Sequence, residues 1–419
     1  MAMLRQLRYH QRDEVLTMST KLSSSSFEWS LAVIAVTLIL ITSASAGTET
    51  VIFRSKNEPG TLIFDSAGNL YGMTSVGGGH NGGTVFKLSP GSDGVWTETV
   101  LHRFNPLNHK DGGNPFLSAG LVFDSAGNLY GTTTSGGEFE QGTVFELTPG
   151  SNGTWTEKIL HSFGPHDSGD GEQPLSSLVF DGAGNLYGTT STGGAGYSGT
   201  VFELSPGKEG WSEKVLHSFS PSPGDGRNPV GGVVFDKAGN LYGTTFLGGR
   251  GSGIVFELSP GSNGTWTETV LHRFKGGSDG GRPYAGLVLD KAGNLYGTAQ
   301  AGIHGKGEVF ALTPASGGGW TMTTIYSFIG PPGDGNLPLD ALVVDATGSL
   351  YGTTYFGGAN KLGTVFKLAP VSGGGWTESV LFSFPGGSNG RNPFCGVTLD
   401  PAGNLYGTAV RGIVFEIMP

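Results

Sequence analysis

The chain has 419 residues, 76 of them glycine, with 37% hydrophobic and 11% aromatic residues and a formal net charge of −10. This apolar content excludes a disordered chain, because it is large enough to form a core. The acidic balance disfavours nucleic acid and anionic membranes as partners, since like charges repel.

The first 46 residues have the pattern of a secretory signal peptide. An apolar run, LAVIAVTLILI, occupies residues 31–41, and small residues follow it up to Ala46. A start at Met18 gives a signal of ordinary length with Lys21 as its positive charge. We expect cleavage between Ala46 and Gly47 and a secreted protein, extracellular or periplasmic; an uncleaved anchor is the alternative. The apolar run is short for a bilayer, so the processed chain is not expected to span a membrane.

One motif, Asp-x-Ala-Gly-Asn-Leu-Tyr-Gly, recurs along the rest of the chain. Its copies begin at Asp65, Asp124, Asp181, Asp236, Asp290, Asp345 and Asp400, and the copy at Asp345 reads DATGSLYG. Consecutive copies lie 54–59 residues apart. A period of this size indicates a repeat architecture.

Each repeat contains four runs with the composition of strands, which we name A to D. In the second repeat these are residues 120–123, 129–133, 142–147 and 155–163. Strand C (GTVFEL) has apolar residues on both faces, so both faces of its sheet are expected to be covered. Four-stranded antiparallel units in tandem are typical of β-propeller blades. Gly131 of strand B is expected to let a neighbouring blade approach closely.

The two ends of the chain predict how the ring closes. The seventh repeat ends with strand C at residues 412–417, and its strand D is missing. Residues 48–53 (TETVIF) match the start of other D strands, such as TETVL at residues 267–271. We therefore predict an all-β, seven-bladed propeller over residues 47–419, with one blade built from three C-terminal strands and the N-terminal strand. This closure leaves no unpaired sheet edge at the seam, and we expect a monomer.

The repeat, with GTVFELSPG, WTEKVLHSF and DxAGNLYGTT in fixed order, resembles the GloVer-type tandem repeat family, whose members are described as choice-of-anchor tandem repeat GloVer-containing proteins. The resemblance covers about residues 48–419. It implies an exported bacterial protein and carries over no catalytic residues.

Several recurrent residues have a structural explanation. The first Asp of each motif is expected to accept backbone hydrogen bonds in the A–B turn, since a calcium loop needs more oxygen ligands than one Asp supplies. The histidines in strand D are expected to fill space, because the same position holds Phe or Tyr in other repeats; they are His102, His161, His217 and His272.

Charges on strand D are expected to protect an exposed edge from aggregation. They are Glu98, Glu157, Lys158, Glu213, Lys214, Glu268 and Glu378. The only cysteine, Cys395, excludes an intramolecular disulfide and is expected to be buried.

The B–C and D–A loops lie on one face of the predicted ring, which we call the loop face. The B–C loops differ between repeats, as a ligand surface requires and as unconstrained loops also do. Candidate ligand-binding residues there are His80, Phe139, Tyr197, Arg250, His304, Lys306, Asn360 and Arg411. The D–A loops carry a recurrent Asp before Gly, which either forms a turn or belongs to a ring of carboxylates at the channel mouth that attracts a cation such as calcium or a polyhydroxyl ligand. These candidates are Asp111, Asp170, Asp225, Asp279 and Asp334.

Two functions are compatible with this pattern. The first is an exported, non-catalytic module that binds a carbohydrate or a protein and needs no cofactor. The second is a secreted hydrolase or lyase acting on a glycan or glycoside at the loop face, which needs two carboxylates or a His–carboxylate pair at catalytic separation. The chain contains no HExxH, P-loop or dinucleotide fingerprint.

Overall fold

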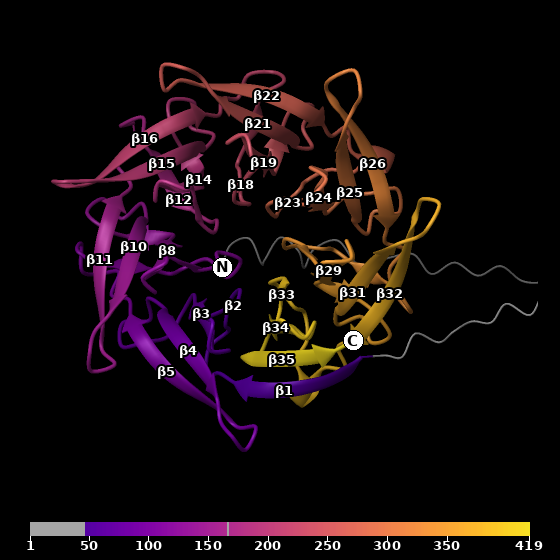
Figure 1. The fold of residues 1–419 in the computed structure, drawn as a ribbon, viewed down its shortest axis with the longest axis horizontal. Coiled ribbons are helices and arrows are strands. Elements are labelled where there is room, and N and C mark those ends of the chain that lie inside the picture. Colours follow the sequence, from indigo (N-terminus) through magenta and orange to yellow (C-terminus); the bar gives the residue numbers. More distant parts are fainter. Residues whose placement is uncertain (1–46, 166) are drawn as a thin grey trace, which may run out of the picture. The chain divides into compact units, whose positions relative to one another are not determined.

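A computed structural model describes residues 47–165 and 167–419. The predicted signal peptide, residues 1–46, lies outside the described residues. The described chain forms seven four-stranded antiparallel sheets arranged as blades around a central axis (Figure 1). The predicted seven-bladed propeller is therefore confirmed.

The blades follow one another in chain order, and strands A to D run from the axis outward. Blade 1 contains β2 (Ile63–Phe64), β3 (Leu70–Thr74), β4 (Thr84–Pro90) and β5 (Trp96–Arg103), and blade 2 contains β7 (Val122–Phe123), β8 (Leu129–Thr133), β10 (Thr143–Pro149) and β11 (Trp155–Ser162). Blade 3 contains β13 (Val179–Phe180), β14 (Leu186–Gly193), β15 (Thr200–Gly207) and β16 (Gly210–Ser218), and blade 4 contains β18 (Val234–Phe235), β19 (Leu241–Thr245), β21 (Ile254–Pro260) and β22 (Trp266–Arg273). Blade 5 contains β23 (Val288–Leu289), β24 (Leu295–Ala299), β25 (Glu308–Pro314) and β26 (Trp320–Ser327), and blade 6 contains β28 (Val343–Val344), β29 (Leu350–Thr354), β31 (Thr364–Pro370) and β32 (Trp376–Ser383). Blade 7 contains β33 (Val397–Leu399), β34 (Leu405–Ala409), β35 (Ile413–Met418) and β1 (Thr48–Arg54).

Short elements lie in the loop-face connections. Three two-residue pairs join a D–A loop to the segment after strand B, namely β6 (Gly112–Gly113) with β9 (Ser135–Gly136), β17 (Gly226–Arg227) with β20 (Leu247–Gly248), and β27 (Gly335–Asn336) with β30 (Phe356–Gly357). In blade 3, β12 (Gly171–Pro174) pairs with β14 in the same way. The 3-10 helices η1 (Gly277–Asp279) and η2 (Gly387–Asn389) occupy D–A loops. No helix within the described ranges is long and apolar enough to cross a bilayer.

The ring closes as the sequence predicts. β1 pairs antiparallel with β35, from Thr48 opposite Met418 to Arg54 opposite Ile413. The register shift after Val51 has a counterpart in the C–D pair of every other blade, so β1 behaves as a D strand. Figure 1 shows β1 outside β35, where the first and last strands of the described chain lie side by side.

The core consists of apolar layers between neighbouring blades. At the seam, Leu70 and Phe86 of blade 1 form one cluster with Tyr406 and Val414 of blade 7, and Phe53 of β1 packs against it. Both faces of strand C are therefore covered, as predicted. The role expected for Gly131 is wrong, because a Cβ there would lie 2.7 Å from the ring of Phe145, which belongs to the adjacent strand of the same blade.

The repeated Asp has the structural role that we predicted. In blade 2, Asp124 Oδ1 accepts the backbone N–H groups of Ala126 and Asn128, both at 2.9 Å. Its Oδ2 accepts hydrogen bonds from the Asn128 amide at 2.7 Å and the Tyr130 hydroxyl at 3.1 Å. Burial opposes ionisation of Asp124, but these hydrogen bonds outweigh it and lower its pKa.

Candidate functional site

The candidate ligand-binding residues of the B–C loops are spread around the ring, with one or two in each blade. They are His80, Phe139, Tyr197, Arg250, His304, Lys306, Asn360 and Arg411, and all are exposed except the half-buried Lys306. The Tyr197 hydroxyl donates a hydrogen bond to Asp167 at 2.6 Å. Their role in ligand binding stays a prediction.

The carboxylates of the D–A loops are not at the channel mouth, so the position expected for them is wrong. In blade 1, Asp111 is buried beside the end of the outer strand β5, where its Oδ1 lies 3.1 Å from Nε2 of His102. Its Oδ2 accepts the backbone N–H of Asn105 at 2.9 Å. Asp111 therefore supplies the acceptor that the backbone N–H of Asn105 needs where the loop folds back over strand D, because a covered backbone N–H requires a partner. The equivalent residues Asp170, Asp225, Asp279 and Asp334 accept backbone N–H groups in the same way.

The strand-D histidines pack as expected but also have a polar neighbour that we did not predict. The ring of His102 lies edge-on to Phe104, with 4.8 Å between centroids, and His161 meets Phe163 at the same distance. Each imidazole also faces the Asp of its own D–A loop. The distances from Nε2 to the carboxylate are 3.0 Å for His161, 3.8 Å for His217 and 3.4 Å for His272.

Four strand-D glutamates do not protect an exposed edge, contrary to our prediction. Glu157, Glu213, Glu268 and Glu378 are half-buried, whereas Glu98, Lys158 and Lys214 are exposed as predicted. Successive side chains of a strand point to opposite faces, so each half-buried Glu lies on the same face as the Trp two residues before it. That face of strand D lies against the neighbouring blade. Burial and then Asp111 raise the pKa of Glu157 to about 8. Its Oε1 is buried, and none of the described residues forms a hydrogen bond with it.

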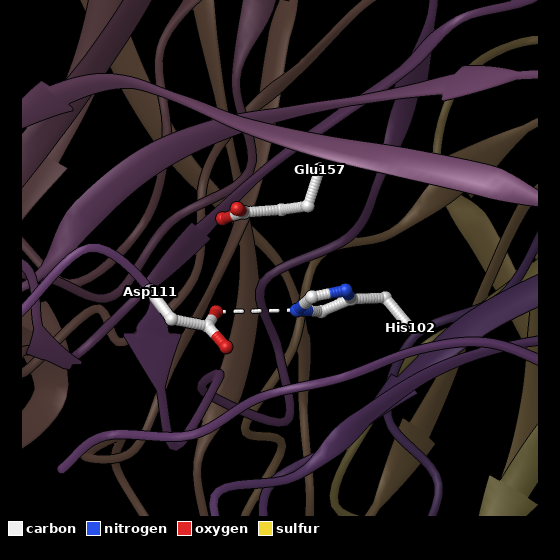
Figure 2. A group of neighbouring side chains, drawn as sticks. All are labelled: His102, Asp111 and Glu157. Atoms are coloured by element: carbon white, nitrogen blue, oxygen red, sulfur yellow. Dashed lines mark hydrogen bonds and ion pairs between the residues drawn. The ribbon is translucent and has the colours of Figure 1, made fainter. Parts of the chain in front are cut away.

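These three residue types meet between consecutive blades. Figure 2 shows His102 and Asp111 of blade 1 facing Glu157 of blade 2. One ligand atom from each of the three residues lies within 4.8 Å of the others. The same arrangement joins His217 and Asp225 of blade 3 to Glu268 of blade 4. We call these groups the 102 cluster and the 217 cluster.

A cavity of about 160 Å³ lies at the axis, where the segments before five A strands, those of blades 2 to 6, converge. Asp340 is the only carboxylate among the described residues that line it. This carboxylate accepts hydrogen bonds from the backbone N–H of Gly396 at 2.6 Å, from that of Ala341 at 2.7 Å and from the Thr61 hydroxyl at 3.3 Å. Burial raises the pKa of Asp340 to about 6 despite these bonds. The hydrogen bonds of the Asp340 side chain therefore connect the consecutive blades 6, 7 and 1 near the axis.

Aromatic rings from separate blades meet at one end of this cavity. Phe116, Tyr284 and Phe394, from blades 2, 5 and 7, have mutual centroid distances of 5.9–6.4 Å. Phe246 lies 5.7 Å from Tyr284, and Tyr355 lies 6.3 Å from Phe394. Phe246 and Tyr355 directly follow β19 and β29, which end at the loop face, so this aromatic floor lies toward that face. We define the aromatic floor as these five residues.

Our sequence reasoning missed the aromatic floor. Phe116, Tyr284 and Phe394 each follow the proline that recurs before strand A, and that position is apolar but varies between blades. The variation of this position between blades is the sequence feature that could have identified the aromatic floor.

Comparisons with known proteins support the fold and the family. The family described as Gloeobacter/Verrucomicrobia repeat matches residues 36–252 and 247–417. No curated protein matches the chain. A solved structure of catalytically inactive virginiamycin B lyase from Staphylococcus aureus with quinupristin is 14% identical, with a TM-score of 0.55 over 89% of this chain and 99% of that one. A Trichoderma reesei enzyme of carbohydrate-active family AA12 is 14% identical, with a TM-score of 0.46 over 90% of this chain and 96% of that one. At this identity the lyase structure shows the fold alone.

Proposed function

The chain belongs to the Gloeobacter/Verrucomicrobia repeat family, and we propose that it is an exported, non-catalytic propeller that binds a carbohydrate over the aromatic floor. Export rests on the signal-peptide pattern of residues 1–46.

The observation that carries this proposal is an aromatic surface that the repeat itself does not require. Three other blades have Leu175, Val230 and Leu339 at the position of Phe116, Tyr284 and Phe394, and these blades are also part of the ring. Three of six copies are thus aromatic, and they come together at the axis. Aromatic rings offer broad apolar contact at small entropic cost and are the usual anchors of binding surfaces.

The groups around the floor provide hydrogen-bond donors suited to a polyhydroxyl ligand. Arg282 is exposed and Arg391 is half-buried in the loop-face segments beside it, and Arg391 Nε has no hydrogen-bond partner among the described residues. Tyr284 lines the cavity and carries a hydroxyl group. A small number of polar groups around an apolar surface is the usual composition of a ligand site. A sugar ring presents one apolar face and a polar rim, which matches this composition.

Among the described residues, the axial cavity offers no catalytic pair for the alternative, a secreted hydrolase or lyase acting on a glycan or glycoside at the loop face. That chemistry needs two carboxylates or a His–carboxylate pair. Asp340 is the only carboxylate among the described lining residues, and three protein donors already occupy it. His–Asp pairs do occur, each between strand D and the D–A loop of the same blade, but they recur in four repeats beside the outer strands, as expected for a group that serves the ring.

The test is a carbohydrate screen followed by calorimetry on the chain that starts at Gly47. Phe116→Leu with Phe394→Leu removes two rings of the floor and introduces the residue that Leu175 and Leu339 place there in other blades. We expect this variant to fold and to bind the selected carbohydrate at least tenfold more weakly. Phe123→Leu, which introduces the residue that Leu289 provides at the equivalent position of strand A in blade 5, is the matched control and should bind as the wild type does.

Replacing His80, Arg250, His304 and Arg411 by Ala tests the wider loop face in the same assay. If the wild type binds no carbohydrate, or if the double Leu variant binds as well as the wild type, the proposal is wrong. A loss confined to the quadruple Ala variant would place the ligand on the loops and not on the aromatic floor.

A further inference from the structure

We propose that the 102 cluster and the 217 cluster each bind one divalent transition-metal ion, with zinc as the reference ion. Each ion would join the outer strand of one blade to that of the next, through one imidazole nitrogen and two carboxylates. This inference does not depend on carbohydrate binding at the axis.

The atoms are already arranged for coordination. In the 102 cluster, His102 Nε2 and Asp111 Oδ1 are 3.1 Å apart, and all three ligand atoms lie within 4.8 Å of one another. Donor atoms around a tetrahedral zinc ion lie about 3.4 Å apart, given zinc–ligand distances of about 2.0–2.1 Å. Moving the Glu157 carboxylate by about 1 Å, through rotation of its side chain, would complete the set.

Buried polar atoms without partners point into both clusters. In the 217 cluster, Nε2 of His217 and Oε1 of Glu268 are buried and have no hydrogen-bond partner among the described residues. In the 102 cluster, the same is true of Oε1 of Glu157, as it is of the equivalent Oε1 atoms of Glu49, Glu213 and Glu378 at other junctions. Buried polar atoms in folded proteins nearly always have a partner, so an unpaired set of ligand type requires an explanation. A cation in each of the two clusters would satisfy the atoms of that cluster at once.

The junctions between blades 5 and 6 and between blades 6 and 7 both lack the histidine, but in different combinations. Where Phe382 replaces the histidine, Asn389 replaces the aspartate, and its amide donates a hydrogen bond to Glu49 at 3.1 Å. At this junction the histidine and the aspartate are lost together, and Oε2 of the remaining glutamate gains a donor from the protein. Between blades 5 and 6, Tyr326 replaces the histidine alone, and Asp334 and Glu378 are kept.

The junction between blades 4 and 5 has the opposite combination. It keeps His272 and Asp279, but Met322 occupies the glutamate position. A fully buried carboxylate, Glu308 of β25, is present instead, and Asp279 contributes to raising its pKa. A Cβ on Gly280, the residue after Asp279, would lie against Glu308 Oε1. Glu308 occupies the position of Thr143, Thr200 and Thr364 in other blades, and it does not form a third cluster of this kind with His272 and Asp279 among the described residues.

The ligand types indicate the class of metal. A neutral imidazole with carboxylates suits zinc and its neighbours in the first transition row, whereas calcium prefers six to eight oxygen ligands. The clusters are also open to exchange, because the side chains of His102 and Asp111 are 18% and 11% exposed, and those of His217 and Asp225 are 22% and 17% exposed. An ion can therefore enter from the surface of the folded protein.

The experiment measures zinc bound to the chelator-stripped chain that starts at Gly47, by calorimetry and by metal analysis after gel filtration. His102→Phe and His217→Phe place in these blades the residue that Phe382 provides in blade 6, so we expect both variants to fold. Each should bind one zinc ion fewer than the wild type, and the double variant two fewer. Zinc should raise the melting temperature of the wild type by several degrees and that of the double variant by less.

Two controls distinguish coordination from packing and from a protonated carboxyl group. Tyr326→Phe changes the equivalent position of a junction that has no histidine, and it should leave the amount of bound zinc unchanged. Glu157→Gln keeps the shape and the hydrogen-bonding capacity of the side chain, and it should weaken zinc binding at least tenfold. If the stripped wild type binds no zinc, or if the double His variant binds as much as the wild type, the proposal is overturned.

Discussion

Opening the seam is the most direct test of how this ring is held together. The change is a chain that starts at Lys56, which lacks β1 and leaves β35 as an unpaired edge strand. Val51, Ile52 and Phe53 of β1 are half-buried and pack on clusters that include blade 7. Without them, the edge of β35 and the apolar layers beside it would face water.

The magnitude follows from what β1 covers. Three half-buried apolar side chains contribute about 1 kcal/mol each, at about half the value for full burial. Uncovering part of Val414 and Phe415, both 0% exposed in the intact ring, costs a further few kcal/mol. The lost hydrogen bonds of the ladder add to this, whereas the freed segment regains chain entropy. We therefore expect a net loss of about 3–6 kcal/mol from a typical stability of about 5–15 kcal/mol.

The assay compares chains starting at Gly47 and at Lys56 by urea unfolding, by thermal melting and by gel filtration. The shorter chain should melt about 5–10 °C lower and should associate through its open edge. Moving TETVIFRS to the end of the chain, after Pro419 and a short Gly/Ser linker, should restore both properties, because the strand would then follow strand C as in every other blade. A shortened chain that stays monomeric and melts with the longer one would refute the reasoning.

Two further predictions concern ionisable groups. Burial and then Asp279 raise the pKa of Glu308 to about 8, so its contribution to stability is fully present below about pH 4.5 and is lost as the pH rises toward 8. Glu308→Gln should therefore match the wild type at pH 5 and exceed it by about 2–4 kcal/mol at pH 9 in urea unfolding with chelator present; a pH-independent difference would contradict this. Hydrogen bonds from Asn185, Ala183 and Tyr187 lower the pKa of Asp181 against the opposing effect of burial, so its contribution is present above about pH 4 and is lost as the pH falls through the folded-state pKa. Asp181→Ala should cost about 1–3 kcal/mol at pH 7 and less at pH 2.5, and an equal cost at both pH values would count against the role of the ionised carboxylate.

The repeat explains how much of the fold could be predicted. The Asp–Ala–Gly–Asn–Leu–Tyr–Gly motif marks the A–B turn in each blade, so its seven copies count the blades. The strand positions in blade 2 follow from local patterns, with β8 as predicted and β10 and β11 within two residues at their ends. Only the innermost strand is clearly shorter than expected, because Val122–Phe123 is the part of strand A that still pairs with strand B near the axis.

The candidate sites could not be predicted in the same way, because they depend on contacts between blades. Glu157 and Lys158 are adjacent polar residues of one strand, and the sequence does not show which of them faces the next blade. The pairing of His102 with Asp111 depends on a loop that folds back toward its own outer strand. The sequence therefore predicts the D–A loop carboxylates too close to the ring axis, although it correctly predicts that each aspartate accepts backbone hydrogen bonds in its own loop.

The number of blades that contain a given residue distinguishes residues that stabilise the fold from residues that are available to bind a ligand. A group present in every blade, such as the turn aspartate, acts within its blade and serves the fold. A group present at some junctions, such as the 102 cluster, acts between neighbours. Residues from non-adjacent blades meet only at the axis, which is where Phe116, Tyr284 and Phe394 lie. A ligand bound there touches several blades at once, so its site exists only while the ring is closed. Removal of β1 should therefore abolish ligand binding at temperatures where the remaining blades are still folded.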